Sequence, residues 1–179
     1  MTSTLVRLQA WRFGALLLAA LSMGASFCHA LELWPKLQWA APLYVEVQNE
    51  PPGLYVMFGT VGAVAEVGSV LAAGVLAYLA RGRGASARLS LIGAVLLVLA
   101  LISWVVFVAP ANSVMREWTP TSVPADWLRW RDQWEYAHAA NFALKLVGFC
   151  ALLASVLAEG VPELASENRA RQTSEAVIA

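Results

Sequence analysis

Long apolar runs dominate the chain, and short polar stretches separate them. A bilayer core of about 30 Å is crossed by roughly 20 apolar residues in a helix. Four segments reach that length, near residues 13–34, 53–80, 87–108 and 134–158. The pattern therefore predicts an all-α polytopic membrane protein, a four-helix transmembrane bundle. We expect residues 1–160 to form this single domain and residues 161–179 to form a polar, frayed or disordered C-terminal tail.

Turn-forming residues support these boundaries, since proline cannot continue a helix. Five prolines lie just outside the spans: Pro35, Pro51, Pro52, Pro110 and Pro162. The link at residues 81–86 is short, so the second and third helices should form an antiparallel hairpin.

Composition agrees with a membrane protein. Apolar residues make up 59% of the chain and charged residues 13%, whereas soluble domains average about 45–50% and about 25%. The net charge is zero, so no basic surface points to a nucleic acid as partner. Two cysteines, Cys28 and Cys150, are too few for a disulfide framework. They should approach opposite faces of the bilayer, so we expect no bridge between them.

The distribution of Lys and Arg predicts the orientation. On the side of the termini lie Arg7, Arg12, Arg81, Arg83, Arg88, Arg169 and Arg171. On the other side lie Lys36, Arg116, Arg129 and Arg131. We therefore expect a cell-membrane protein with both termini in the cytoplasm. A second interpretation is that the first apolar segment is a secretory signal peptide, cleaved before Leu31.

Polar and ionisable residues interrupt three of the four predicted spans. They are His29 and Glu32 in the first, Glu66 in the second, and Glu135, His138, Asn141 and Lys145 in the fourth. Such residues are costly in lipid and usually face the bundle interior or mark a functional site. The third span carries no charge beyond Arg88 at its edge, and we expect it to be structural.

Depth and helical spacing predict which of these residues meet. With a rise of about 1.5 Å per residue, His29 lies about 8 Å deep and His138 about 6 Å deep. Glu66 and Lys145 both lie about 17–20 Å deep. Residues three or four apart share one helix face. We therefore expect the two histidines to face one outward-opening cavity, and Glu66 to pair with Lys145.

Four interpretations of these residues stay open. A metal centre could use Glu135, His138, His29 and Glu32, because Glu-x-x-His places both ligands on one face. A haem could be held axially by His29 and His138. A histidine near neutral pKa could act as a base. Alternatively, the network is only structural, and its hydrogen bonds fix the helix register.

The stretch at residues 110–149 resembles the four-helix membrane family that includes the fungal anthrone oxygenases. It carries Pro110-x-Asn112 after the third span, a Trp-rich loop, and Trp134-x-x-x-His138 at the start of the fourth. By position, the resemblance points to Asn112, Trp134, His138 and Asn141.

The family implies oxidation of an activated aromatic carbon by molecular oxygen, with no cofactor required. A base such as His138 would remove the acidic proton of the substrate, and the carbanion would react with oxygen. Our catalytic candidates are His138, His29, Asn141 and Glu66. The expected partners are the lipid bilayer, a small apolar or aromatic substrate and oxygen, while homo-oligomerisation is left open.

Two other functions compete with an oxidoreductase. A non-catalytic scaffold or accessory subunit would use the polar residues for packing alone. A small-solute or proton-coupled carrier would use Glu66 and Lys145, but the halves of the chain show no repeat. The inner halves of the helices are nearly pure Ala, Leu, Val and Gly, which disfavours a polar path across the bilayer. We rank the enzyme first, the scaffold second and the carrier third.

Overall fold

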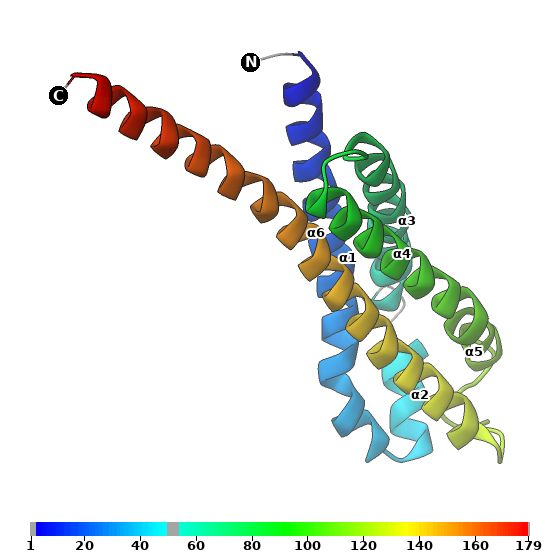
Figure 1. Cartoon of the computed structure of the whole chain (residues 1–179). Helices are drawn as coiled ribbons and strands as arrows, with labels where there is room; N and C mark the ends of the chain where they lie inside the picture. The colour runs from blue at the N-terminus through cyan, green and yellow to red at the C-terminus, as the bar shows by residue number, and fades with distance from the viewer. Residues whose placement is uncertain (1–2, 50–53, 179) are drawn as a thin grey trace.

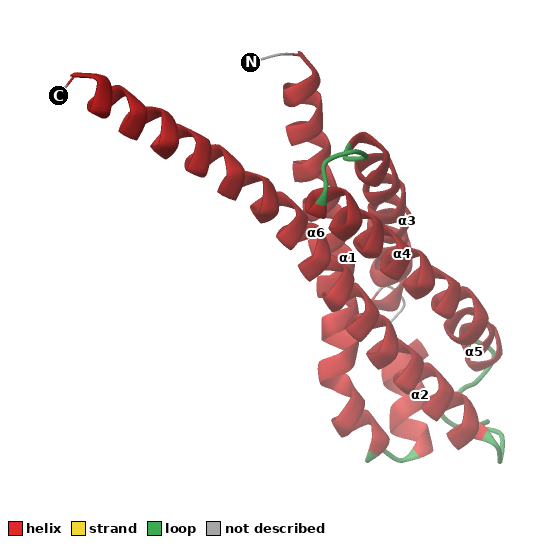
Figure 2. Cartoon of the chain, in the orientation of Figure 1, coloured by secondary structure: helices red, strands yellow, loops and turns green. Residues whose placement is uncertain are grey.

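Helices make up all the regular structure in the described part of the chain (Figure 2). This computed structural model describes the backbone of residues 3–49 and 54–178, and the side chains of residues 6–49 and 57–158. Within these ranges, four helices are long and apolar enough to cross a membrane. The predicted all-α fold is confirmed, and the chain is a multi-pass membrane protein.

Four long helical segments, which we call rods, form the bundle, and a short helix lies beside one end. In chain order the elements are α1 (Ser3–Leu37), α2 (Ala41–Asn49), α3 (Leu54–Leu79), α4 (Ala85–Ser103), the π-helix η1 (Trp104–Val108), α5 (Ala109–Met115) and α6 (Trp127–Ile178). The α4, η1 and α5 segments follow one another without a break and form the third rod. The first turns of α1 and the α3–α4 connection lie at one end of the bundle, and α2 and the α5–α6 loop lie at the other (Figure 1).

The connection between α3 and α4 is the tight turn expected for an antiparallel hairpin. Gly82 has φ 84° and Gly84 has φ 57°, values that glycine adopts without the steric penalty of a Cβ atom. The chain reverses direction within a few residues, and α4 packs back against α3.

Several helices run past the prolines that were expected to end them, so that expectation is wrong. Helix α1 contains Pro35 and ends two residues later, at Leu37. Pro110 lies in the first turn of α5, where its missing N–H costs least. Helix α6 continues through Pro162 to Ile178 and leaves the bundle as a long extension (Figure 1). The Ala- and Glu-rich composition of this tail favours a helix. Pro51 and Pro52 lie outside the described residues.

Close approach of α4 and α6 depends on two glycines. A Cβ atom on Gly93 would lie 2.6 Å from Leu152 Cγ and 2.9 Å from the Gly148 carbonyl oxygen. Small residues allow such approach between membrane helices. The surrounding core, in the half of the bundle nearer the N-terminus of α1, is apolar and includes Leu97 and Leu152. This apolar core packs through van der Waals contacts, and nearby a buried hydrogen bond from Arg12 Nη2 to Ser86 Oγ at 3.4 Å links α1 to α4.

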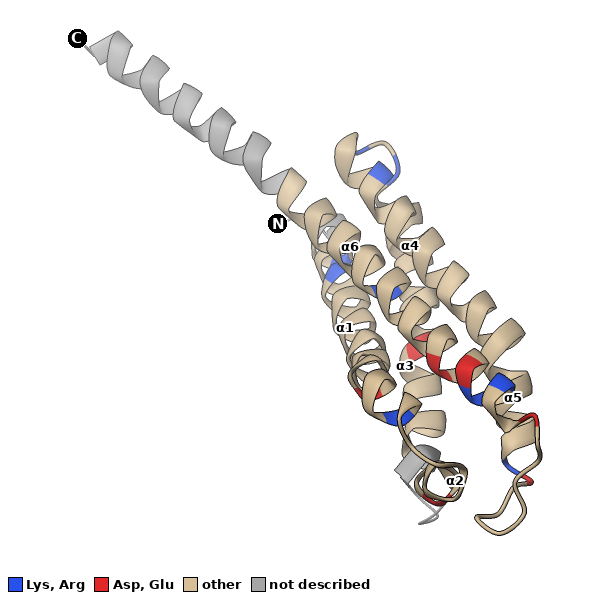
Figure 3. Ribbon diagram, turned by 90° about the horizontal axis from the view of Figure 1, so that it is seen from below, with Lys and Arg blue, Asp and Glu red and all other residues tan. Residues whose placement is uncertain are grey.

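Among the described side chains, most of the charged ones lie in the opposite half of the bundle. Asp and Glu residues gather toward α2 and α5, whereas Lys and Arg occur at both ends (Figure 3). This asymmetry places the candidate chemistry in one half of the molecule.

Candidate functional site

Two histidines from distant parts of the sequence meet between α1 and α6. The ring centroids of His29 and His138 lie 4.3 Å apart, and both residues are buried. The shared depth predicted from helical rise is confirmed by this contact. Trp134 completes the group, with its ring 4.1 Å from His138 and 5.1 Å from His29.

A hydrogen bond between α5 and α6 holds the tryptophan of this group. Trp134 Nε1 donates to Asn112 Oδ1 at 2.6 Å, and Trp134 is only 3% exposed. Asn112 had been singled out only through the family resemblance, and the structure brings it next to Trp134. Since Trp134 packs on both imidazoles, Asn112 also helps to position the histidines.

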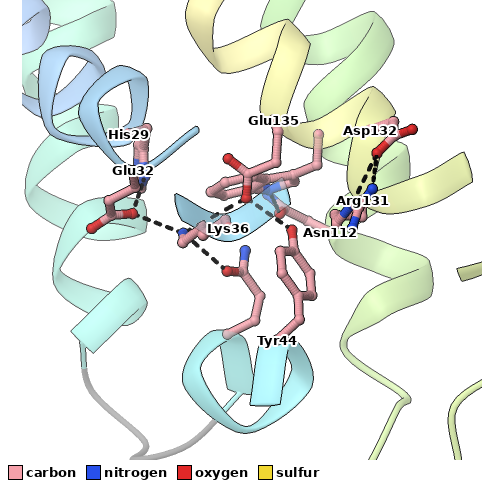
Figure 4. A network of polar contacts seen from close by, with 10 residues as sticks. His29, Glu32, Lys36, Tyr44, Asn112, Arg131, Asp132 and Glu135 are labelled. Atoms are coloured by element: carbon pink, nitrogen blue, oxygen red, sulfur yellow. Dashed lines mark hydrogen bonds and ion pairs between the residues drawn. The ribbon is translucent and has the colours of Figure 1, made fainter. Parts of the chain in front are cut away.

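A network of ion pairs and hydrogen bonds lies beside the histidines, toward α2 (Figure 4). Lys36 Nζ lies 2.7 Å from Glu32 Oε2 and 3.8 Å from Glu135 Oε1. The Tyr44 hydroxyl donates to Glu135 Oε1 at 3.1 Å. Glu32 Oε2 is also 3.6 Å from His29 Nδ1, so Glu32 links the lysine to the imidazole pair. Lys36 and Glu135 are almost completely buried, and each therefore depends on the other members of this network.

Tyr44 was not identified from the sequence. It lies on α2, a nine-residue helix that is too short to span a membrane. Its side chain is 1% exposed and packs with Val45 against the end of the bundle. Two adjacent buried residues among polar neighbours do not form a distinctive sequence pattern. The segment is also too short to be predicted as a membrane span.

A second polar cluster lies at the middle of the bundle. Lys145 Nζ donates hydrogen bonds to Glu66 Oε2 and, at 2.8 Å, to Ser26 Oγ. Ser22 Oγ donates to the same Glu66 oxygen at 3.0 Å. The predicted pairing of Glu66 with Lys145 is confirmed, and two serines of α1 complete it.

Two cavities meet at the histidines. The inner one has a volume of about 140 Å³ and reaches Glu66 and Lys145. The outer one has a volume of about 560 Å³ and is bordered by polar residues such as Asn112 and Arg116. Five residues line both cavities: His29, Phe58, Gly59, Trp104 and His138. The imidazole pair therefore lies where the outer cavity leads into the inner one.

Trp104 is brought to this junction by the π-helix. It is the first residue of η1, and π-helical turns are rare features often found at functional sites. A π turn shifts the hydrogen-bonding pattern, and Gln133 Nε2 of α6 donates to the Phe107 carbonyl oxygen at 2.9 Å. The third rod, which we expected to be structural, thus contributes a wall of both cavities.

Asn141 is buried but does not join the histidines at the cavities. It is 1% exposed, and it is absent from the residues lining either cavity. Neither polar atom of its amide has a hydrogen-bond partner among the described residues. Its predicted catalytic role therefore gains no support from its position.

The residues expected to hold a metal do not form a metal site in the structure. Across the described side chains, no group of three or more His, Cys, Asp and Glu residues could hold a metal ion. Glu135 and Glu32 are instead directed at Lys36 (Figure 4). A haem between the histidines does not fit either, because ring centroids 4.3 Å apart leave no space for a macrocycle between them.

Both cysteines, Cys28 and Cys150, are free and exposed on the helix surfaces.

Comparisons of the chain with protein-family models, with curated proteins and with solved structures find no match. The chemistry of the two cavities is therefore the basis for assigning a function to this multi-pass membrane protein.

Proposed function

We propose that the protein is a membrane oxidoreductase of the anthrone-oxygenase type, which oxidises an activated carbon of a small aromatic substrate with molecular oxygen. The observation that carries this proposal is the imidazole pair of His29 and His138 at the junction of two cavities. A base at the junction can reach a substrate held partly in each cavity. The apolar walls suit a substrate that partitions into lipid.

The first step is removal of a proton from the substrate carbon by His138. The imidazole of His138 can act as this base because it lies at the junction of the cavities, in ring contact with His29. Glu32, 3.6 Å from His29 Nδ1, would stabilise the positive charge that the pair then holds. Trp134 fixes the orientation of both rings.

The second step joins the carbanion to oxygen. The carbon and oxygen form a C–O bond, and a proton from the imidazole pair gives a hydroperoxide. Loss of water from the hydroperoxide leaves a ketone. In sum, a CH₂ group and one O₂ become a C=O group and one H₂O, and the carbon supplies all four electrons. The substrate itself is the reductant, so the step needs no bound redox group.

The outer cavity gives this site its route of entry. Its border combines the polar side chains of Gln48, Asn49, Asn112 and Arg116, which suit contact with water or lipid headgroups. With both termini in the cytoplasm, as the Lys and Arg distribution favours, this border faces the opposite side of the cell membrane.

The test is turnover of anthrone by the detergent-purified protein in air. We expect anthraquinone to form with consumption of one O₂ per anthrone, above the rate in empty micelles. His138→Ala should lower the rate at least about 100-fold, since general bases contribute about 10²–10⁴-fold. Ser155→Ala, a buried change in α6 outside both cavities, is the matched control and should keep the rate. Equal rates for the His138 variant and the control would overturn the proposal.

A scaffold or accessory subunit is the second candidate. The dense pairing of Lys36 with Glu32 and Glu135 favours it, because such a network can fix helix register without chemistry. Absence of turnover together with loss of folding in Lys36→Met would support this function.

A further inference from the structure

We infer that Lys145 binds the oxygen of an aromatic ligand whose ring occupies the inner cavity, and that it stabilises negative charge on that oxygen during turnover. As a statement about turnover, this inference rests on the proposed function. As a statement about binding, it can be tested alone.

The size of the inner cavity suits a ligand of one ring. Its volume is about 140 Å³, and a protein cavity of about 150 Å³ holds one benzene. Phe58, Leu101 and Trp104 supply apolar walls, and Gly59 and Gly62 leave space between them. A larger aromatic substrate would place one ring here and the remainder in the outer cavity.

The two ends of this cavity differ in chemistry. The imidazoles of His29 and His138 lie at the junction with the outer cavity, and Lys145 and Glu66 lie at the deep end. A ring that spans the space would therefore meet a base at one edge and an ammonium group at the other.

Lys145 has a hydrogen-bond donor to spare for such a ligand. An ammonium group has three N–H donors, and the described residues take two of them, through Ser26 Oγ and Glu66 Oε2. Glu66 Oε2 also accepts from Ser22, so the carboxylate is held in place and in turn holds the lysine. The third N–H donor of Lys145 can therefore bind a ligand, because Lys145 lines the cavity.

This arrangement would stabilise the carbanion formed in the proposed reaction. Charge that develops on the reacting carbon moves through the ring to a conjugated oxygen, and a fixed donor at that oxygen lowers the barrier. The proton removed from carbon stays on the imidazole pair, so the total charge of ligand and cavity does not change.

The inference can be tested by equilibrium binding of 4-nitrophenol, whose phenolate form is coloured, and of nitrobenzene, its neutral analogue. Both are measured in detergent micelles with and without protein, at a pH where a minor fraction of free 4-nitrophenol is ionised. The double variant Glu66→Gln/Lys145→Gln removes both charges but keeps hydrogen-bonding side chains. Ser155→Ala is the control.

We expect the natural protein to increase the phenolate absorbance and to bind 4-nitrophenol at least about tenfold more tightly than nitrobenzene, as a hydrogen bond to a charged group allows. The double variant should lose that preference and still bind nitrobenzene. No preference for 4-nitrophenol in the natural protein would overturn the inference, whatever the double variant does. An unchanged preference in the double variant would also overturn it.

The two proposals can fail separately. Phenolate binding that depends on Lys145, without anthrone turnover, would support the proposed binding site and contradict the proposed oxidase activity. Turnover that depends on His138, with no preference for 4-nitrophenol, would support the oxidase activity and contradict the role of Lys145.

Discussion

Lys145 on α6 donates a hydrogen bond to Glu66 on α3 at the middle of the bundle. The two residues are 79 positions apart in the sequence, and their side chains are 4% and 13% exposed. Each is a charge that would be unpaired in an apolar environment without the other. The pair therefore links two helices and also forms the deep end of the inner cavity.

Replacing one member of this pair should lower the free energy of unfolding more than replacing both. We expect Glu66→Leu or Lys145→Met alone to lower the free energy of unfolding by about 3–5 kcal/mol, because each leaves a buried charge uncompensated. The double variant Glu66→Leu/Lys145→Met should lose less than either single variant. Unfolding in mixed micelles, followed by circular dichroism, measures all three. Small and equal losses would contradict a buried pair.

Asn112 and Trp134 should behave as a unit. Asn112→Ala leaves the buried indole N–H without its acceptor, which we expect to cost about 1–3 kcal/mol of stability. It should also reduce anthrone turnover, because Trp134 packs on both histidines. Adding Trp134→Phe removes the unpaired donor and should recover part of the stability, although not the turnover. Thermal melts and oxygen uptake measure these effects, and a double variant less stable than Asn112→Ala would contradict the pairing.

The crossing of α4 and α6 should not tolerate a side chain at Gly93. Gly93→Ala places a methyl group 2.9 Å from the Gly148 carbonyl oxygen, and overpacking of this kind typically costs about 1–3 kcal/mol. Gly74→Ala is the matched control, because its added methyl group meets nothing within 4 Å. We expect the control to be neutral or stabilising by up to about 1 kcal/mol, since alanine favours helices. Comparable melting temperatures for both variants would argue against the close crossing.

The orientation in the membrane can be tested with reporters. Fusions or accessible cysteines at Gly84, in the α3–α4 turn, should report the cytoplasm, because Arg81, Arg83 and Arg88 lie around it. The same probes at Ser122, in the α5–α6 loop, should report the opposite side. One location for both would rule out the four-span topology, and exchanged locations would reverse the orientation.

Much of the fold follows from composition and periodicity alone. Apolar runs of about 20 residues determine the number of spans, since a helix of that length satisfies its own backbone hydrogen bonds in lipid. A rise of about 1.5 Å per residue then determines depth. These two quantities are local, and they were sufficient to predict that His29 meets His138 and that Glu66 meets Lys145.

The tertiary structure decided what surrounds these pairs. Tyr44 and Lys36 draw Glu135 into a network beside the histidines, whereas the i, i+3 spacing had suggested that Glu135 and His138 bind a metal together. Spacing shows that two side chains share a face, but not which neighbouring helix supplies the partner.

The cavities themselves also depend on the packing of distant segments. The π-helix turns Trp104 into the junction, and Asn141, one turn along α6 from His138, is buried outside both cavities. Rotation of each rod about its axis sets these positions. That rotation depends on contacts between helices, such as the approach of Gly93 to Gly148. These two residues are far apart in the sequence, so the sequence pattern does not predict their contact. The chain's own pattern therefore determined the spans and the depth of each polar residue, and only the packed bundle decided which of them share a cavity.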